Sequence, residues 1–152
     1  MSKFTAILGA AILAISVSGI ISTTAHAEEA KLIKKGSKVF KKCKACHVPD
    51  EAKNKVGPHL LNIVGRKFGA AEGYSYSDAL KAKAGEGLVW DEANLAAFLE
   101  KPRKFLKGTK MAFGGLRKEK DRNAIIAYFK SLSIDNPDPN LPSKEAPKEE
   151  AK

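Results

Sequence analysis

The sequence feature that most constrains this chain is a pair of cysteines two residues apart, followed at once by a histidine. The five residues read Cys43-Lys44-Ala45-Cys46-His47, and they contain both cysteines of the 152-residue chain. On a helix, residues three and four apart share a face. Two thiols with this spacing can bond to one edge of a porphyrin, and the next imidazole can reach its iron. The pattern is typical of covalent c-type haem attachment.

Three other interpretations of the cysteine pair fit the sequence less well. A thioredoxin-like redox pair expects a preceding strand and a βαβ setting, and no alternating strand pattern of useful length is present. A structural zinc site needs four ligands, but the only other histidines are His26 and His59. A disulfide across two residues would close a tiny loop and add little stability. One covalent haem c is therefore the predicted cofactor.

The N-terminal segment, residues 1–27, is interpreted as a signal peptide. Lys3 gives a positive start, residues 4–21 are almost wholly apolar, and Ala25-His26-Ala27 has the small-large-small form that signal peptidases cut after. We expect cleavage after Ala27 and export to the periplasm. The alternative is an uncleaved membrane anchor, because the apolar run approaches the roughly 18 residues that span a bilayer. Only then would the protein be held at a membrane.

The C-terminal segment, residues 135–152, is predicted to be a disordered tail. It contains four prolines and a run of Lys, Glu and Ala, with Leu141 as its one large apolar residue. Such a segment cannot bury enough apolar surface to offset the entropy lost on ordering. The folded domain is therefore expected over residues 28–134, a length that suits one small domain.

Apolar spacing predicts an all-α domain with long loops. Along four stretches apolar residues recur at intervals of three or four, the period of a helix with one buried face. A core of this size with so much loop is small, and a large flat apolar cofactor would complete it. We therefore expect helices and loops wrapped round one haem. The expected helices are 29–43, from 75–78 to 85–87, from Asp91 to Pro102, where the proline ends the helix, and 120–132.

The second axial ligand has two candidates. Met111 is the only methionine after the leader, and it lies in a Gly-containing loop rather than on an apolar helix face. A lone methionine more often fills a core, but a loop can aim this sulfur at an iron, and a thioether ligand raises the potential. His59 would instead give bis-histidine iron and a lower potential. We favour Met111, because His59 directly follows Pro58 and lies only twelve residues after His47.

From about Gly36 to Leu132 the chain resembles the class I c-type cytochromes, of the bacterial cytochrome c2 and mitochondrial cytochrome c kind. The resemblance depends on the order and spacing of many short motifs, and it implies the small cytochrome c fold. The motifs are Gly36, Phe40, Cys43-Lys44-Ala45-Cys46-His47, Gly57-Pro58-His59-Leu60, Gly65-Arg66, Gly73-Tyr74-Ser75-Tyr76-Ser77, Trp90, Pro102, Gly108-Thr109-Lys110-Met111 and Arg122 with Ala127-Tyr128.

The resemblance implies a role for each matching position at the iron. Cys43 and Cys46 would form the two thioethers. His47 and Met111 would be the axial ligands. The carbonyl of Pro58 would accept the ring proton of His47, a bond that fixes the orientation of a ligating imidazole.

The resemblance also implies a group of residues around the haem propionates. Arg66, Tyr76 and Trp90 would hydrogen-bond a buried propionate, since a buried carboxylate needs donors or a cation. Thr109 would lie near the propionates and the loop that carries the methionine.

Two positions depart from the pattern of this family. Phe98 stands where a tyrosine is frequent, so it cannot donate a hydrogen bond near the methionine sulfur. Lys107 stands where a proline is usual, so the ligand loop is expected to be less rigid. The hydrogen bond missing at Phe98 predicts an altered potential and an altered tendency to lose the Met111 bond.

The function implied by the resemblance is that of a soluble exported monohaem electron carrier, expected to be a monomer. Its donor would be a quinol–cytochrome c oxidoreductase, and its acceptor a terminal oxidase, a photosynthetic reaction centre or another reductase. The formal net charge of +10 suits acidic docking surfaces on such partners. The basic positions expected around the haem edge are Lys42, Lys44, Lys55, Arg103, Lys104 and Lys110.

Two other functions were weighed against electron transfer. Nucleic-acid binding would also suit a basic chain, but the sequence has no arginine-rich arm and no finger spacing. A small haem enzyme, such as a peroxidase, or a gas-binding haem protein would need a labile ligand at Met111. The prediction is therefore a carrier and not an enzyme, with the haem enzyme as the alternative.

Overall fold

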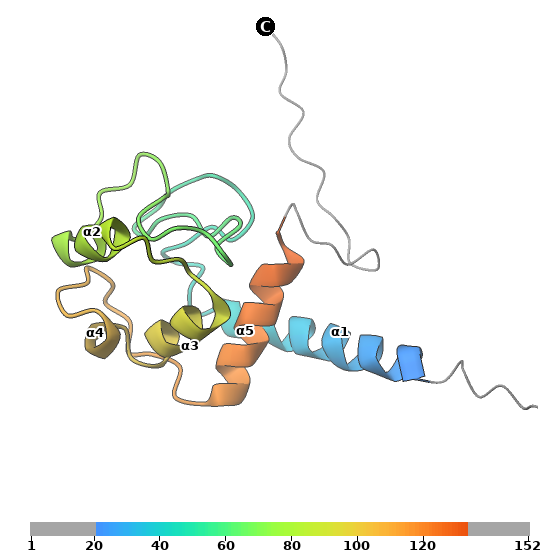
Figure 1. Cartoon of the computed structure of the whole chain (residues 1–152). Helices are drawn as coiled ribbons and strands as arrows, with labels where there is room; N and C mark the ends of the chain where they lie inside the picture. The colour runs from blue at the N-terminus through green and yellow to red at the C-terminus, as the bar shows by residue number, and fades with distance from the viewer. Residues whose placement is uncertain (1–20, 134–152) are drawn as a thin grey trace, which may run out of the picture.

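The computed structural model describes residues 21–133, and this part of the chain is helical (Figure 1). Residues 1–20 of the predicted signal peptide and the whole predicted tail, 135–152, lie outside the described residues. Within residues 21–133, β-type pairing is limited to one isolated bridge between Lys67 and Val89, so the all-α prediction is confirmed. The helices are α1 (Ile21–Phe40), α2 (Asp78–Gly85), α3 (Glu92–Glu100), α4 (Pro102–Phe105) and α5 (Glu119–Ser131).

The starts of α2 and α3 follow from short polar side chains that cap them. The Ser77 hydroxyl accepts a hydrogen bond from the backbone N–H of Leu80 (3.3 Å). The Asp91 carboxylate accepts one from the N–H of Asn94 (2.7 Å). Each bond satisfies an N–H that the first turn of a helix would otherwise leave without a partner. Both starts were predicted from these residues and are confirmed.

The third helix ends just before Pro102, as predicted, but Pro102 also begins a further short helix, which was not predicted. α3 already ends at Glu100, and Pro102 is the first residue of the short helix α4. Proline is tolerated there, because the N–H that it lacks would have no partner in a first helical turn. The turn closes with a bond from the N–H of Leu106 to the Pro102 carbonyl (2.9 Å).

The first helix is longer at its start than the sequence predicted. α1 begins at Ile21 and has no acidic residue in its first turn, and its N-terminal half extends away from the other helices (Figure 1). The expected cleavage position after Ala27 lies inside this helix, and residues 25–30 are exposed. Cleavage at that position stays a prediction.

The first and last helices pack directly against each other. Figure 1 shows α5 crossing α1 near the C-terminal end of α1. At the crossing, a Cβ on Gly36 would overlap the Ala124 carbonyl of α5 and the Tyr128 side chain. The Phe40 ring lies 5.7 Å from that of Tyr128 and 6.1 Å from that of Phe129, between ring centroids. The glycine therefore allows α1 and α5 to approach closely, and the aromatic rings pack together beside this contact.

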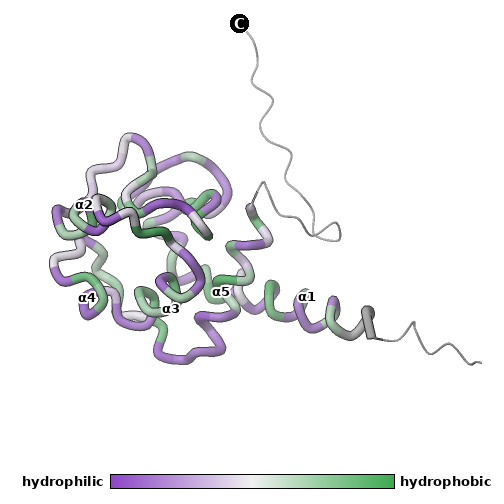
Figure 2. Tube along the Cα trace, in the orientation of Figure 1, coloured by the Kyte–Doolittle hydropathy of each residue, from purple (hydrophilic) through white to green (hydrophobic). Residues whose placement is uncertain are grey.

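Hydrophilic and hydrophobic residues alternate along the helices, as Figure 2 shows for α1 and α5. No helix within residues 21–133 is long and apolar enough to cross a membrane. The apolar run weighed above as a membrane anchor falls almost wholly in residues that the structure does not describe.

Candidate haem site

A largely apolar cavity of about 300 Å³ lies between the helices and the loops that join them. Pockets for small molecules and cofactors begin at about this size. Apolar side chains from three different helices form much of its wall, among them Leu80, Leu95 and Phe129. The cavity is also lined by every residue that the sequence predicted to hold the cofactor: Cys43, Cys46, His47, Pro58, Arg66, Tyr76, Trp90, Thr109 and Met111.

Successive tight turns after α1 bring the cysteines and the histidine to one side of the cavity. The Phe40 carbonyl accepts hydrogen bonds from the N–H groups of Cys43 (2.7 Å) and Lys44 (3.1 Å), and the Cys43 carbonyl accepts from those of Cys46 and His47 (both 3.0 Å). Both cysteines are free of a disulfide. Cys43 is buried and Cys46 half-buried, and burial raises the pKa of the Cys43 thiol to about 11.

His47 is held in one orientation, and its neutral ring in one tautomer. Its Nδ1 lies 2.7 Å from the carbonyl oxygen of Pro58, and because a carbonyl can only accept, Nδ1 carries the ring proton. The Nε2 lone pair is then free to bind a metal. Burial lowers the pKa of His47, and the Pro58 bond acts in the opposite direction. The neutral ring is the form that can be a ligand.

Gly57 is a site residue to which the sequence analysis gave no role. A Cβ at this position would overlap the imidazole ring of His47. Glycine therefore lets the loop before Pro58 close against the ring. The signal for this contact was present in the sequence, since Gly57 directly precedes the proline whose carbonyl meets the histidine.

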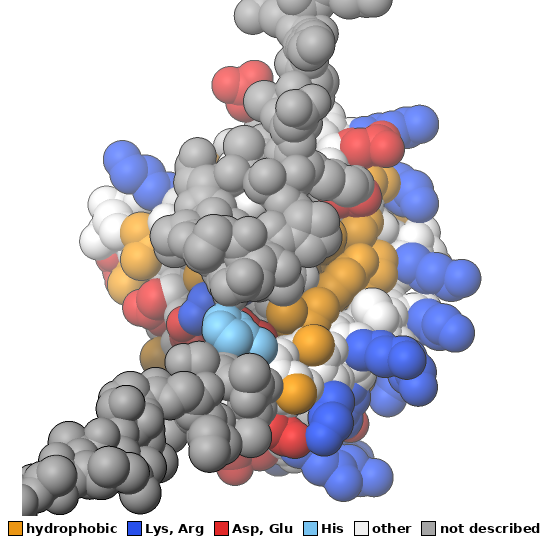
Figure 3. All heavy atoms as spheres, turned by 90° about the vertical axis from the view of Figure 1, so that its right-hand side faces the viewer, with side chains coloured by type: hydrophobic (Ala, Val, Ile, Leu, Met, Phe, Trp, Pro, Cys, Tyr) orange, Lys and Arg blue, Asp and Glu red, His pale blue; other side chains and the backbone are white. Residues whose placement is uncertain are grey.

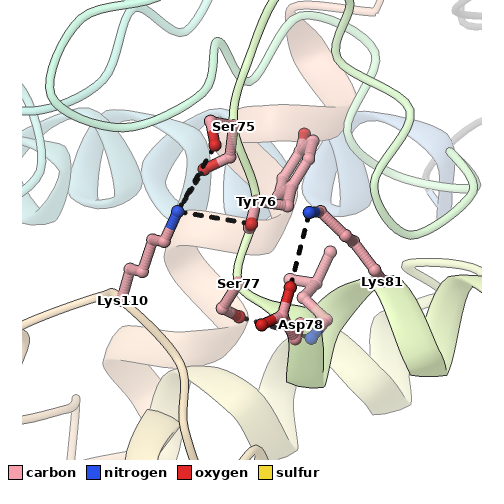
Figure 4. Close-up of polar contacts among 7 residues, drawn as sticks. Ser75, Tyr76, Ser77, Asp78, Lys81 and Lys110 are labelled. Carbon is pink, nitrogen blue, oxygen red and sulfur yellow. Dashed lines mark hydrogen bonds and ion pairs between the residues drawn. The ribbon is translucent and has the colours of Figure 1, made fainter.

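Met111 reaches the cavity from the loop after α4, a segment separate from the one that carries His47. Its N–H donates a hydrogen bond to the Thr109 hydroxyl (3.2 Å). Lys110 directly precedes Met111. Its Nζ donates hydrogen bonds to the Ser75 carbonyl (2.9 Å) and to the Tyr76 carbonyl (3.3 Å), as Figure 4 shows. These bonds tie the methionine loop to the segment before α2. From the sequence, Lys110 was expected only among the basic residues around the haem edge, and its bonds to the segment before α2 were not predicted.

Arg66 is bound by backbone carbonyls on one side and lines the cavity on the other. Nη2 donates to the His59 carbonyl (2.8 Å), and Nη1 donates to the Leu61 carbonyl (2.9 Å). Its buried Nε has no hydrogen-bond partner in the described part of the chain. Close by, the Tyr76 hydroxyl accepts from the N–H of Ala71 (3.1 Å), and this bond leaves the hydroxyl proton available to another acceptor.

Two aromatic residues of the cavity lining, Trp90 and Phe98, pack against further aromatic rings. Trp90 stacks on Phe68 with 3.7 Å between ring centroids and lies 5.0 Å from Phe98. Phe98 is buried and in turn meets Phe105 of α4 at 5.8 Å. Lys107, the other departure from the family pattern, is exposed. Sequence analysis missed Phe68, whose contact with Trp90 depends on the isolated bridge between their neighbours.

The chain is similar to known proteins of one family. The chain matches the family model Cytochrome c over residues 33–133. It is 53% identical over 100 residues to cytochrome c of Gibberella zeae, which covers 64% of this chain and 92% of that protein. It is 42% identical over 111 residues to cytochrome c2 of Afifella marina, which covers 72% of this chain and 90% of that protein.

A solved structure is similar over nearly all of its own length. Cytochrome cH from Methylobacterium extorquens matches with a TM-score of 0.59 and 47% identity, covering 65% of this chain and 97% of that one. Residues 33–133 include the whole predicted site, and the family implies a covalently bound haem c. The helical fold, the family match and these relatives agree that the chain belongs to the cytochrome c family, as a class I c-type cytochrome.

Proposed function

We propose that this protein is a monohaem electron carrier that is exported to the periplasm. The observation that carries the proposal is the convergence of Cys43, Cys46, His47 and Met111 on one largely apolar cavity, in a chain of the cytochrome c family. A haem c bound there supplies a reversible ferric–ferrous couple. The residues of the chain determine how the group is held, which ligands it keeps and which partners reach it.

The two ligands of the iron come from separate and differently restrained segments. Cys43 and Cys46 would attach the porphyrin, and His47 would present Nε2 while the Pro58 carbonyl holds Nδ1. Met111 would supply the second ligand. The competing residue, His59, is not among the residues that line the cavity, and its ring nitrogen lies 3.2 Å from Arg66. A site closed by two protein ligands suits electron transfer, which needs no open coordination position.

The polar groups of the cavity fit the carboxylates that a haem carries. The unpartnered Nε of Arg66 is a buried charged donor, and leaving such a donor unsatisfied costs about 1–3 kcal/mol or more. A propionate next to Arg66 would satisfy it. The Tyr76 hydroxyl, the Trp90 indole and the Thr109 hydroxyl belong to residues that line the same cavity, and each can donate a hydrogen bond.

The surface near the cavity is basic, which supports acidic redox partners. Lys42 and Lys110 line the cavity itself, and Arg103 and Lys104 border a neighbouring depression of about 440 Å³ beside Phe113. Figure 3 shows Lys and Arg side chains gathered along one edge of the face that it draws. We propose a quinol–cytochrome c oxidoreductase as donor, and a terminal oxidase, a reaction centre or another reductase as acceptor. The six basic positions expected at the haem edge are all exposed: Lys42, Lys44, Lys55, Arg103, Lys104 and Lys110.

Electron transfer with an acidic partner is expected to slow as salt is added. Opposite charges speed encounter by about 10-fold or more at low ionic strength, and salt screens this gain. Stopped-flow rate constants measured over a range of salt concentrations give the slope of the rate constant against ionic strength. Lys104→Gln is expected to reduce the slope. Lys31→Gln, on the projecting part of α1 where Lys31 pairs with Glu28, is the control and is expected to change it less. Rate constants that are independent of salt contradict this docking mode.

Optical spectroscopy of the mature protein tests the proposed function itself. We expect haem that stays with the protein after acid–acetone treatment, because thioether bonds survive denaturation, and spectra that do not change when cyanide or carbon monoxide is added at neutral pH. Cys43→Ser with Cys46→Ser is expected to release the haem. Rapid binding of cyanide or carbon monoxide by the unmodified protein would instead indicate the small haem enzyme or gas-binding protein.

A further inference from the structure

We propose that His59 is a positioning residue for Arg66, and that the protonation of His59 is coupled to the redox state of the haem. The inference rests on the proposed function, because it takes a haem propionate as the anionic partner of Arg66. It gives a role to the one histidine of the domain that does not line the cavity.

The contacts between the two side chains require a neutral imidazole. Nη1 of Arg66 lies 3.2 Å from Nδ1 of His59, while Nη2 donates to the carbonyl of the same residue. A guanidinium has donors only, so Nδ1 must be the acceptor and the ring proton must lie on Nε2. A second proton on the ring would occupy Nδ1 and place two cations within hydrogen-bond distance. The contact with Arg66 therefore exists only while His59 is neutral.

The backbone of His59 cannot easily move away when the ring is protonated. Its N–H donates to the side-chain oxygen of Asn54 (3.0 Å), and the side-chain nitrogen of Asn54 donates to the Glu72 carbonyl (2.7 Å). One amide side chain thus joins two loops and holds His59 beside Arg66. Protonation changes the charge and hydrogen bonding at Arg66 while the surrounding backbone stays in place.

The charged group that faces the imidazole is Arg66. Asn54 is neutral, Glu72 approaches through its backbone carbonyl rather than its carboxylate, and Leu61 contributes a carbonyl to Arg66. Burial lowers the pKa of His59 from its ordinary value of 6.5, and the positive charge of Arg66 lowers it further. The neutral ring that the geometry requires is therefore the state present at neutral pH.

Coupling to the haem follows from the sign of the charges. Reduction adds one electron to the site, so a nearby imidazolium is more stable in the ferrous than in the ferric protein. Such coupling is reciprocal. The reduction potential is thus higher below the pKa of His59, and it falls as the pH rises through that pKa. The pKa of His59 is in turn lower in the ferric protein than in the ferrous one.

Two measurements on the haem-loaded protein test the inference. The reduction potential is followed by spectroelectrochemistry from about pH 4 to 8, the range in which histidines titrate. The ring proton signals of His59 are titrated by NMR in both redox states. We expect an inflection in the potential that coincides with the NMR pKa values of His59, and a lower value in the ferric state.

Two substitutions separate the effect of His59 as a hydrogen-bond acceptor for Arg66 from the effect of its charge when protonated. His59→Asn keeps a side-chain oxygen that can accept from Arg66, so it should lose the inflection but retain the potential measured above about pH 7.5, where histidine is neutral. His59→Leu removes the acceptor as well, so it should lose the inflection and also shift that potential. Lys67→Gln removes an exposed charge next to Arg66 in the sequence and should keep the inflection.

Several outcomes would overturn the inference. They are an inflection that persists in His59→Asn, a His59 pKa that is equal in both redox states, and a His59→Leu protein that matches the unmodified one above about pH 7.5. If His59→Leu does not fold, His59→Asn and the NMR titration still show whether His59 is coupled to the haem. Failure of the proposed function is a separate result, because it appears as missing covalent haem or as an open iron in the unmodified protein.

Discussion

Replacing Gly36 with alanine lowers the free energy of unfolding, whereas the same change at Gly85 raises it. A Cβ on Gly36 would overlap the Ala124 carbonyl and the Tyr128 side chain, so α1 and α5 would have to move apart. Forcing extra atoms into a packed core costs about 1–3 kcal/mol and occasionally more. Because one of the atoms in the way belongs to the backbone, we expect a loss of about 3 kcal/mol.

Gly85 is the matched control, because it too is a helical glycine. No atom lies within 4 Å of a Cβ built there, and it is the last residue of α2. Alanine should therefore stabilise the protein by about 0.5–1 kcal/mol through the smaller entropy of the unfolded chain. Denaturant unfolding of both haem-loaded variants gives the two changes. Equal changes at both positions would mean that the α1–α5 contact adds nothing.

Replacing Met111 with alanine is expected to open the iron without releasing the haem. Cys43 and Cys46 would still hold the porphyrin, and His47 would keep its Pro58 bond. The variant should bind cyanide in the ferric state and carbon monoxide in the ferrous state at neutral pH. Its reduction potential should fall by on the order of 0.1–0.2 V, a fraction of the roughly 0.8 V range over which axial ligands set haem potentials.

Met111→His is the matched control for this experiment. It restores a second protein ligand but replaces a thioether with an imidazole, so the potential should remain low while added ligands are again excluded. Optical titration and spectroelectrochemistry measure both properties. If Met111→Ala remained closed to cyanide, another side chain such as His59 would be the ligand, and the assignment of Met111 would be wrong.

The parts of this structure that the sequence predicted depend on local chemistry. Ser77 and Asp91 lie directly before the helices that they cap. Gly36 and Phe40 were singled out as motifs of the resemblance, and their contacts with the last helix are known from the structure. The helix that begins at Pro102 was not predicted, because a proline that ends one helix can also occupy the first turn of the next, and only the tertiary path after Glu100 decides whether it does.

The contacts that the sequence could not predict join segments far apart along the chain. Lys110 meets Ser75 across 35 residues, and Asn54 meets Glu72 across 18. Neither pair leaves a periodic pattern, because each depends on where two loops pass one another. For the same reason Tyr76 and Thr109 were assigned to the site by resemblance and not by spacing. Local reasoning identified the haem motif, but not the network that restrains the cavity around it.

Cleavage at the predicted position, which lies within α1, would change how that helix begins. The helix as described begins at Ile21 without an acidic residue in its first turn. A cut after Ala27 would make Glu28 and Glu29 the first two residues. Carboxylates at a helix start each stabilise it by about 0.3–1 kcal/mol, which would offset the positive charge of the new amino terminus. Processing would thus shorten the first helix and leave the remaining part better matched to its own dipole.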